Sequence, residues 1–204
     1  MAIARALAAK PEVLLLDEPF SALDPALRTD MHELIADIRA ALSPTIVLVT
    51  HDRDEASAVA DRIALLHKGE LLQHDTVENI YTRPASLRVA RLMGGLNEIP
   101  GIVTAGVHSS VMGRVPVASG TADGQGTLVI RQEAVAVIPA GAGASGGLVG
   151  VVSGIRRQGP RSTIEIAFAA ELAIFADVPP GSSLAVGSHV EVRFPAGSVH
   201  VVTG

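Results

Sequence analysis

The chain has 204 residues, of which 48% are apolar, a formal net charge of −5 and no cysteine. The lack of cysteine excludes disulfides and thiolate metal sites, and the negative charge argues against a polyanionic partner such as nucleic acid. No apolar run approaches the roughly 20 residues that a bilayer crossing needs, so any membrane attachment is expected to come through other proteins.

The first predicted strand ends in two carboxylates. Residues 13–16 read Val-Leu-Leu-Leu and lead directly into Asp17 and Glu18. Ligands of open α/β sheets bind at the carboxyl ends of the strands, where one carboxylate can enter a magnesium shell and its neighbour can orient an attacking water. A core strand followed by an ordinary loop is the alternative interpretation of the same residues.

A helix and a second strand follow. Asp24 and Pro25 form a good N-cap and first-turn pair, which predicts a helix from Pro25 to about Leu42. The apolar run 45–50 then predicts a strand that delivers His51 at its end. Taken alone, a histidine in this position is more readily explained by hydrogen bonds to the backbone than by a functional role.

The next forty residues are predicted to mix short strands with helices. Residues 62–71 favour two short strands around a turn at Gly69. Helical patterns cover residues 54–60, 76–81 and 86–92.

The motifs LLLDEP, SALD, VTHD and ADRIALLHKGEL occur in this order within residues 1–92. Together they resemble the C-terminal half of the ATP-binding subunit of ABC transporters. The resemblance implies an α/β fold, the C-terminal half of a P-loop NTPase nucleotide-binding domain, which uses ATP and Mg²⁺. It also implies that Asp17 is the Walker B aspartate holding Mg²⁺ through water, that Glu18 is the catalytic base, and that His51 is the switch histidine contacting the γ-phosphate. These roles suit phosphoryl transfer, which needs positioning and charge neutralisation.

The loop that contains Ser21 and Asp24 matches the family's D-loop. In the family this loop crosses a dimer interface and links two ATP sites. The helix-cap interpretation of Asp24 is compatible with that role.

The sequence contains no Walker A motif. Its only lysines are Lys10 and Lys68, and neither follows a glycine. The family's Q-loop and Ser-Gly-Gly-Gln signature, which should precede the helix at residues 3–9, are missing as well. Met1 stands where the family commonly has valine, so we expect a misplaced start or a frameshift, with a genuinely short protein as the alternative. The chain alone is expected to be inactive and to need the missing N-terminal half for normal binding of ATP and Mg²⁺.

Composition predicts a second domain. Residues 1–96 hold 24 charged side chains and 3 glycines, whereas residues 97–204 hold 13 and 17. We therefore expect the ATPase half at 1–92, a linker at 93–100 and an all-β barrel at 101–204. The strands predicted there are 127–131, 134–138, 148–155, 163–168, 171–175, 189–194 and 198–202.

This second domain resembles the TOBE module, an OB-like barrel found on importer ATPases. The resemblance rests on the segments 129–135, 150–155 and 186–192, with 199–201 near the end. In the family the module serves dimer contact, regulation and sometimes solute binding. Its six arginines against seven acids, without Trp or Tyr, make nucleic-acid binding an unfavoured alternative.

The combined resemblance implies an ATP-hydrolysing subunit of an ABC importer for a small solute. Its expected partners are a second ATPase subunit in a homodimer, transmembrane permease subunits and, indirectly, a periplasmic or extracellular solute-binding protein. Its expected place is the cytoplasmic face of the cell membrane. The alternative is a non-catalytic remnant whose barrel is a regulatory, solute-binding or dimerisation module. Polyamine, ferric iron, phosphonate, sulfate and molybdate all remain open as solutes.

Overall fold

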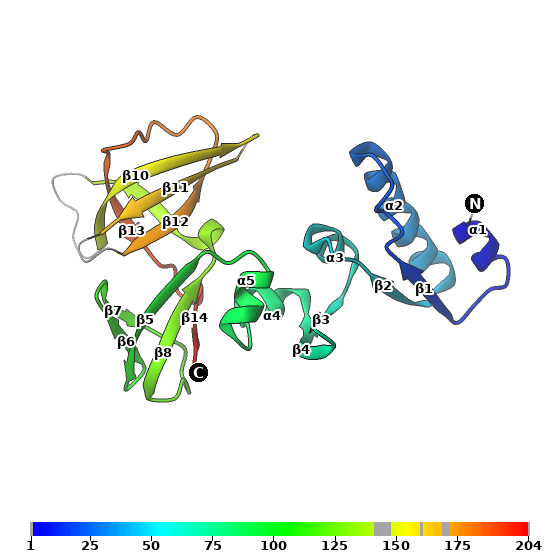
Figure 1. Ribbon diagram of the computed structural model, residues 1–204, viewed down its shortest axis with the longest axis horizontal. Helices are drawn as coiled ribbons and strands as arrows, with labels where there is room; N and C mark the ends of the chain where they lie inside the picture. Colours follow the sequence, from blue (N-terminus) through cyan, green and yellow to red (C-terminus); the bar gives the residue numbers. More distant parts are fainter. Residues whose placement is uncertain (1, 141–147, 160, 169–171, 204) are drawn as a thin grey trace. The chain divides into compact units, whose positions relative to one another are not determined.

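The structure, a computed structural model, describes residues 2–140, 148–159, 161–168 and 172–203 (Figure 1). Its contacts divide the chain into two compact units, residues 1–63 and residues 64–204. This division falls before the predicted domain boundary at residues 93–100, which rests on the change in composition and stays a prediction.

The first unit is built around a two-stranded parallel sheet. Its elements are α1 (Ala2–Leu7), β1 (Val13–Asp17), α2 (Pro25–Leu42), β2 (Thr45–Val49) and α3 (Arg53–Val59). β1 and β2 pair from Val13 opposite Thr45 to Asp17 opposite Val49. The two strands therefore end together, as the α/β prediction requires.

One face of this sheet carries the core of the unit. Leu14 and Leu16 are buried with Phe20 and with Ile35 of α2. The alternate residues Val13 and Leu15, together with Val47 and Val49 of β2, are exposed. Because side chains alternate between the faces of a strand, the second face of the sheet is also apolar and is open to solvent.

The second unit begins within a small hairpin. β3 (Arg62–His67) pairs with β4 (Glu70–Thr76), and Gly69 in the turn between them has a φ of 81° that favours glycine. α4 (Val77–Thr82) and α5 (Leu87–Leu92) follow. These elements agree with the predicted strand pair and the predicted helices.

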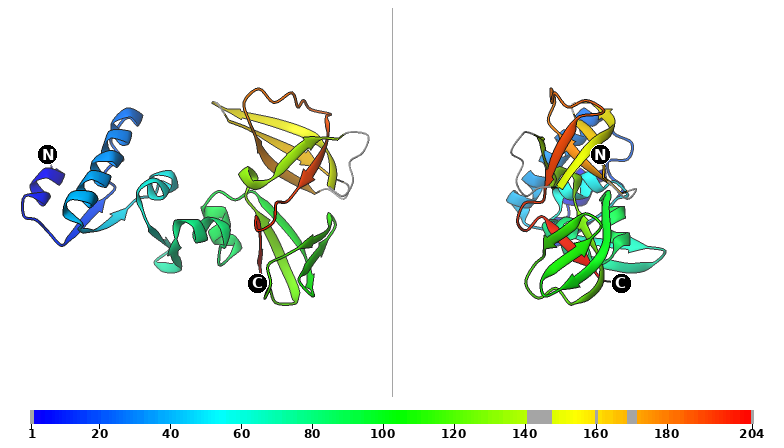
Figure 2. Two further views of the ribbon diagram at one scale, coloured as in Figure 1. Left: turned by 180° about the vertical axis from the view of Figure 1, so that it is seen from behind. Right: turned by 90° about the vertical axis from the view of Figure 1, so that its left-hand side faces the viewer.

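The remaining strands form two five-stranded antiparallel sheets, shown from two further sides in Figure 2. One sheet has the order β12-β11-β10-β13-β9 and the other has the order β14-β8-β5-β6-β7. The first contains β9 (Ala136–Pro139), β10 (Leu148–Gln158), β11 (Arg161–Ala167), β12 (Ala173–Val178) and β13 (His189–Arg193). The second contains β5 (Asn97–Thr104), β6 (Val107–Ser110), β7 (Gly113–Pro116), β8 (Gly124–Ile130) and β14 (Val199–Val202), and a 3-10 turn at Gln132–Ala134 follows β8.

The two sheets share one apolar core. It joins Ile99 and Leu128 of one sheet to Val152, Ile166 and Val190 of the other. The predicted all-β character is confirmed, and the structure adds that the strands divide between two sheets.

Strands β5 to β7 were not predicted, and β5 occupies the last positions of the predicted linker. Pro100 and Gly101 interrupt the apolar alternation of β5. Pro100 pairs with Thr127 of β8, while pairing with β6 begins only at Ile102, so proline is tolerated there. A Cβ at Gly101 would lie 2.4 Å from the Ser109 carbonyl oxygen and 2.5 Å from the His108 ring, so the position needs glycine.

Among the residues that the structure describes, no helix is both long enough and apolar enough to span a membrane.

Candidate functional site

The predicted catalytic side chains meet where β1 and β2 end. The Glu18 amide donates to the Val49 carbonyl at 2.8 Å, which extends the parallel pairing one step beyond Asp17. This hydrogen bond brings Glu18 beside the end of β2, the strand that leads to His51. His51 Nδ1 lies 2.8 Å from Glu18 Oε1.

The contact between His51 and Glu18 lies at the surface. Their side chains are 77% and 44% exposed, respectively. The hydrogen bond to Glu18, then its negative charge, raises the pKa of His51 above the ordinary value of 6.5, and the more remote Asp52 and Glu55 carboxylates add to the effect. The pair therefore favours an imidazolium that can donate a hydrogen bond.

Glu18 has an unusual backbone. Its φ is 41°, in the left-handed region that residues with a side chain rarely adopt. Ser21 holds the turn, because its Oγ donates to the Glu18 carbonyl at 2.9 Å and its amide reaches the same oxygen at 3.3 Å. Backbone strain maintained by surrounding contacts is common at functional sites. Ser21, one of the two predicted D-loop residues, thus stabilises the backbone turn at Glu18.

Asp24 caps α2. Its side chain accepts from the Leu27 amide at 2.9 Å, as the Asp-Pro pattern predicts. The role of Ser21 and Asp24 at a dimer interface stays a prediction.

Asp17 ends β1 with an exposed side chain. Among the described residues, no group of three or more His, Cys, Asp or Glu side chains is arranged to hold a metal ion. Magnesium sites commonly use one or two protein carboxylates and take their other ligands from water and phosphate. The role of Asp17 in holding Mg²⁺ through water stays a prediction.

A polar network beside His51 was missed by the sequence reasoning. Thr50 Oγ1 donates to Glu55 Oε2 at 2.7 Å, and Asp52 caps α3 by accepting from the amides of Asp54 and Glu55. Arg28 of α2 forms ion pairs with Asp52 and Glu55 of this network. The Asp52 cap has a local sequence signal, an aspartate before an acidic first turn, whereas the contacts of Arg28 have none.

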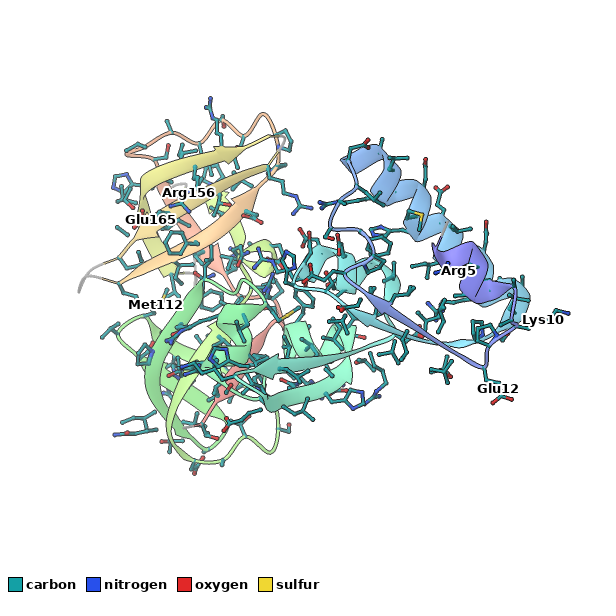
Figure 3. The ribbon with its side chains drawn as sticks, turned by 45° about the vertical axis from the view of Figure 1, so that its right-hand side comes forward. Arg5, Lys10, Glu12, Met112, Arg156 and Glu165 are labelled. Atoms are coloured by element: carbon teal, nitrogen blue, oxygen red, sulfur yellow. The ribbon has the colours of Figure 1, made fainter. Side chains whose placement is uncertain are left out.

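Several basic side chains outside this site are exposed. Lys10 lies in the turn after α1 and its side chain points away from the protein (Figure 3). Arg156, Arg157 and Arg161 are exposed at the ends of β10 and β11.

The second unit contains a separate apolar cavity of about 80 Å³. Ile80, Tyr81, Met93 and Val129 contribute to its lining. The Arg131 guanidinium at its edge stacks 4.8 Å from the Tyr81 ring centroid and donates to the Met93 carbonyl at 2.5 Å. The Arg131 guanidinium therefore connects α4, through Tyr81, and the end of α5, through Met93, to the sheet.

Comparison with known proteins matches both parts of the chain. The TOBE domain family model matches residues 128–202. An Fe(3+) ions import ATP-binding protein of Rhodococcus jostii is 40% identical over 151 residues, which are 74% of this chain and 44% of that protein. An Fe(3+) ions import ATP-binding protein of Pseudomonas fluorescens is 34% identical over 206 residues, covering 99% of this chain and 58% of that protein.

A third relative is named for a different solute. A sulfate/thiosulfate import ATP-binding protein of Bradyrhizobium diazoefficiens is 35% identical over 193 residues, covering 93% of this chain and 55% of that protein. The chain thus spans between 44% and 58% of these relatives. Over the part that it spans, the chain belongs to the importer-type ATP-binding subunits of ABC transporters that carry a C-terminal TOBE domain.

Proposed function

We propose that residues 1–63 form the magnesium and water-activating side of an ABC-type ATPase site. The observation that carries this proposal is the 2.8 Å contact between His51 and Glu18, at the joint end of two parallel strands. Ligand sites of open α/β sheets lie at such ends.

The donor set suits ATP with Mg²⁺. Bound Mg²⁺ with ATP supplies the transferable phosphoryl group and neutralises its charge. In this proposal Asp17 would hold the metal through water, and Glu18 would orient the attacking water and take its proton. His51 would donate a hydrogen bond to the terminal phosphate. Its raised pKa favours the protonated donor form.

The phosphate cradle has to come from residues outside this sequence, which contains no Gly-Lys pair. The exposed apolar sheet face supports this arrangement. Parallel sheets are ordinarily covered on both faces. Our proposed cover is the part of an ATP-binding subunit that carries the P-loop, because the relatives extend well beyond the matched region.

The wider role follows from the relatives. These relatives are named as import ATP-binding proteins, so we assign this chain to a subunit that drives import of a small solute. The Ser21–Asp24 segment would contact a second ATPase subunit, and permease subunits would hold the dimer at the cytoplasmic face of the membrane. A solute-binding protein would act through those permeases.

The direct test compares ATP hydrolysis by this chain with hydrolysis by the same chain joined to a P-loop half of the Rhodococcus relative. Hydrolysis is expected only in the joined protein, and Glu18→Gln should abolish it while nucleotide binding persists. Hydrolysis by the 204-residue chain that Glu18→Gln left unchanged would refute the site.

The second candidate is a non-catalytic module formed by the two-sheet unit. The observation favouring it is that residues 64–204 form a compact unit with its own core. Titrating the full chain with ferric citrate, sulfate, molybdate or spermidine tests it by thermal shift. Stabilisation by one of these, with no activity in the joined protein, would favour this candidate over the ATPase.

A further inference from the structure

Arg28 contacts two loops that are distant in sequence. It lies in the first turns of α2, and its Nε donates to the Leu23 carbonyl at 3.3 Å. Its Nη1 lies 3.5 Å from Asp52 Oδ2 and 3.7 Å from Glu55 Oε1. One guanidinium therefore touches both the segment that ends in Asp24 and the residues after His51.

The carboxylate that Arg28 meets in α3 is buried. The Glu55 side chain is only 7% exposed, and a buried charge needs a partner of opposite charge and hydrogen bonds. Arg28 faces one of its oxygens, and the Thr50 hydroxyl donates to the other at 2.7 Å. The same Thr50 oxygen accepts from the Asp52 amide at 3.0 Å. The residues on both sides of His51 are thus tied to the network that Arg28 completes.

The other loop leads back to Glu18. The Leu23 carbonyl is bound by Arg28, the Leu23 amide donates to Phe20 at 3.0 Å, and Ser21 binds the Glu18 carbonyl. Both partners of the contact between His51 and Glu18 therefore sit on segments that converge on Arg28.

We propose that Arg28 is a positioning residue that fixes the Ser21–Asp24 segment and the His51 loop relative to each other. This rests on the proposed function, in which the first segment faces a second subunit and the second meets the terminal phosphate. Arg28 then links events at the subunit contact to the placement of His51.

The geometry requires a guanidinium. Its Nε and Nη1 point to different partners in a fixed fork, whereas a lysine ammonium is one compact charge on a flexible stem. Arg28→Lys keeps the positive charge, but its ammonium should contact only one of the two loops at a time. Arg28→Gln should form neither of the two ion pairs.

The test is an NMR titration of His51 in the 204-residue chain without nucleotide, so it does not depend on ATPase activity. The charged groups that act on His51 are Glu18, Asp52 and Glu55, and Arg28 forms ion pairs with the last two of them. If Arg28 only supplied charge, Arg28→Gln would raise the pKa of His51 further, because a repelling cation is lost. If Arg28 positions the loops, His51 separates from Glu18 and its pKa falls towards 6.5.

Arg39→Gln is the matched control. Arg39 also lies on α2 and binds across to the Val59 carbonyl at 3.1 Å and to Asp61, away from His51. We expect its loss to lower stability without moving the His51 titration. A lowered His51 pKa in both Arg28 variants, but not in Arg39→Gln, supports the proposal.

A His51 pKa that is unchanged or raised in folded Arg28→Lys and Arg28→Gln overturns the proposal.

The unmodified chain gives a second test that needs no variant. The Arg28 Nε–H should exchange slowly with solvent and show a nuclear Overhauser contact to Leu23, and rapid exchange without that contact would equally overturn the proposal.

Discussion

The imidazole of His51 lies 2.8 Å from the carboxylate of Glu18, a residue 33 positions earlier in the chain. The contact raises the pKa of His51 above its unfolded value of 6.5. His51 therefore binds its proton more tightly in the folded protein than in the unfolded chain. The stabilisation is complete below pH 6.5 and is lost as pH rises through the higher folded pKa.

We predict that His51→Gln and Glu18→Gln each remove this pH dependence. Urea unfolding at pH 5.5 and pH 9 measures the free energy of unfolding of each protein. The difference in this free energy between wild type and variant should be smaller at pH 9 than at pH 5.5. The double variant should resemble the single variants, because either change already breaks the contact. A difference that grew with pH would contradict the assignment of the protonated histidine.

The left-handed backbone of Glu18 gives a second prediction. Glu18→Ala and Glu18→Gly both delete the carboxylate, so their comparison isolates the backbone. Glycine adopts a φ of 41° without a Cβ penalty, and Glu18→Gly should be more stable than Glu18→Ala by about 1 kcal/mol. At Leu15, in extended β1, the order should reverse. Equal unfolding midpoints for the two Glu18 variants would argue against strain at this position.

Local patterns were enough to predict the scaffold of the candidate site. The Asp24–Pro25 pair and the apolar periodicity predicted α2 to both of its ends, and the two apolar runs predicted β1 and β2. The contact of His51 with Glu18 could be expected only through the family resemblance, because it depends on parallel pairing of the two strands.

Other features were beyond local patterns. Arg28 meets Asp52 and Glu55 across the chain, and nothing in its own surroundings predicts those partners. Asn97 falls in the predicted linker, which was placed where the composition changes, although it is buried at the start of β5. Its hydrogen bonds come from a strand far along the sequence.

Asn97 provides the third prediction. Its side-chain amide donates to the Phe175 carbonyl at 2.8 Å and accepts from the Phe175 amide at 2.7 Å, so it joins β5 of one sheet to β12 of the other. Asn97→Ala leaves both backbone groups without this partner and should cost about 2 kcal/mol.

Gln73→Ala is the control for Asn97. Gln73 also binds two backbone groups, the Arg83 carbonyl and the Ala85 amide, but at an exposed site where water can replace it. We expect a cost of less than about 1 kcal/mol for that change. Chemical unfolding monitored by far-ultraviolet circular dichroism compares the two, and equal costs would show that Asn97 does not bridge the sheets in solution.

Asp24 allows the helix cap and the proposed subunit contact to be separated. Its carboxylate accepts from the Leu27 amide at 2.9 Å, an interaction that serine or asparagine can also make. Asp24→Ala should therefore cost about 1 kcal/mol of stability, and Asp24→Asn should cost much less. If the negative charge also contacts a second subunit, Asp24→Asn should weaken self-association of the chain joined to a P-loop half, although the folded monomer is intact. Sedimentation velocity with ATP and Glu18→Gln in the background measures that association. Unchanged association in Asp24→Asn would leave Asp24 with the capping role alone.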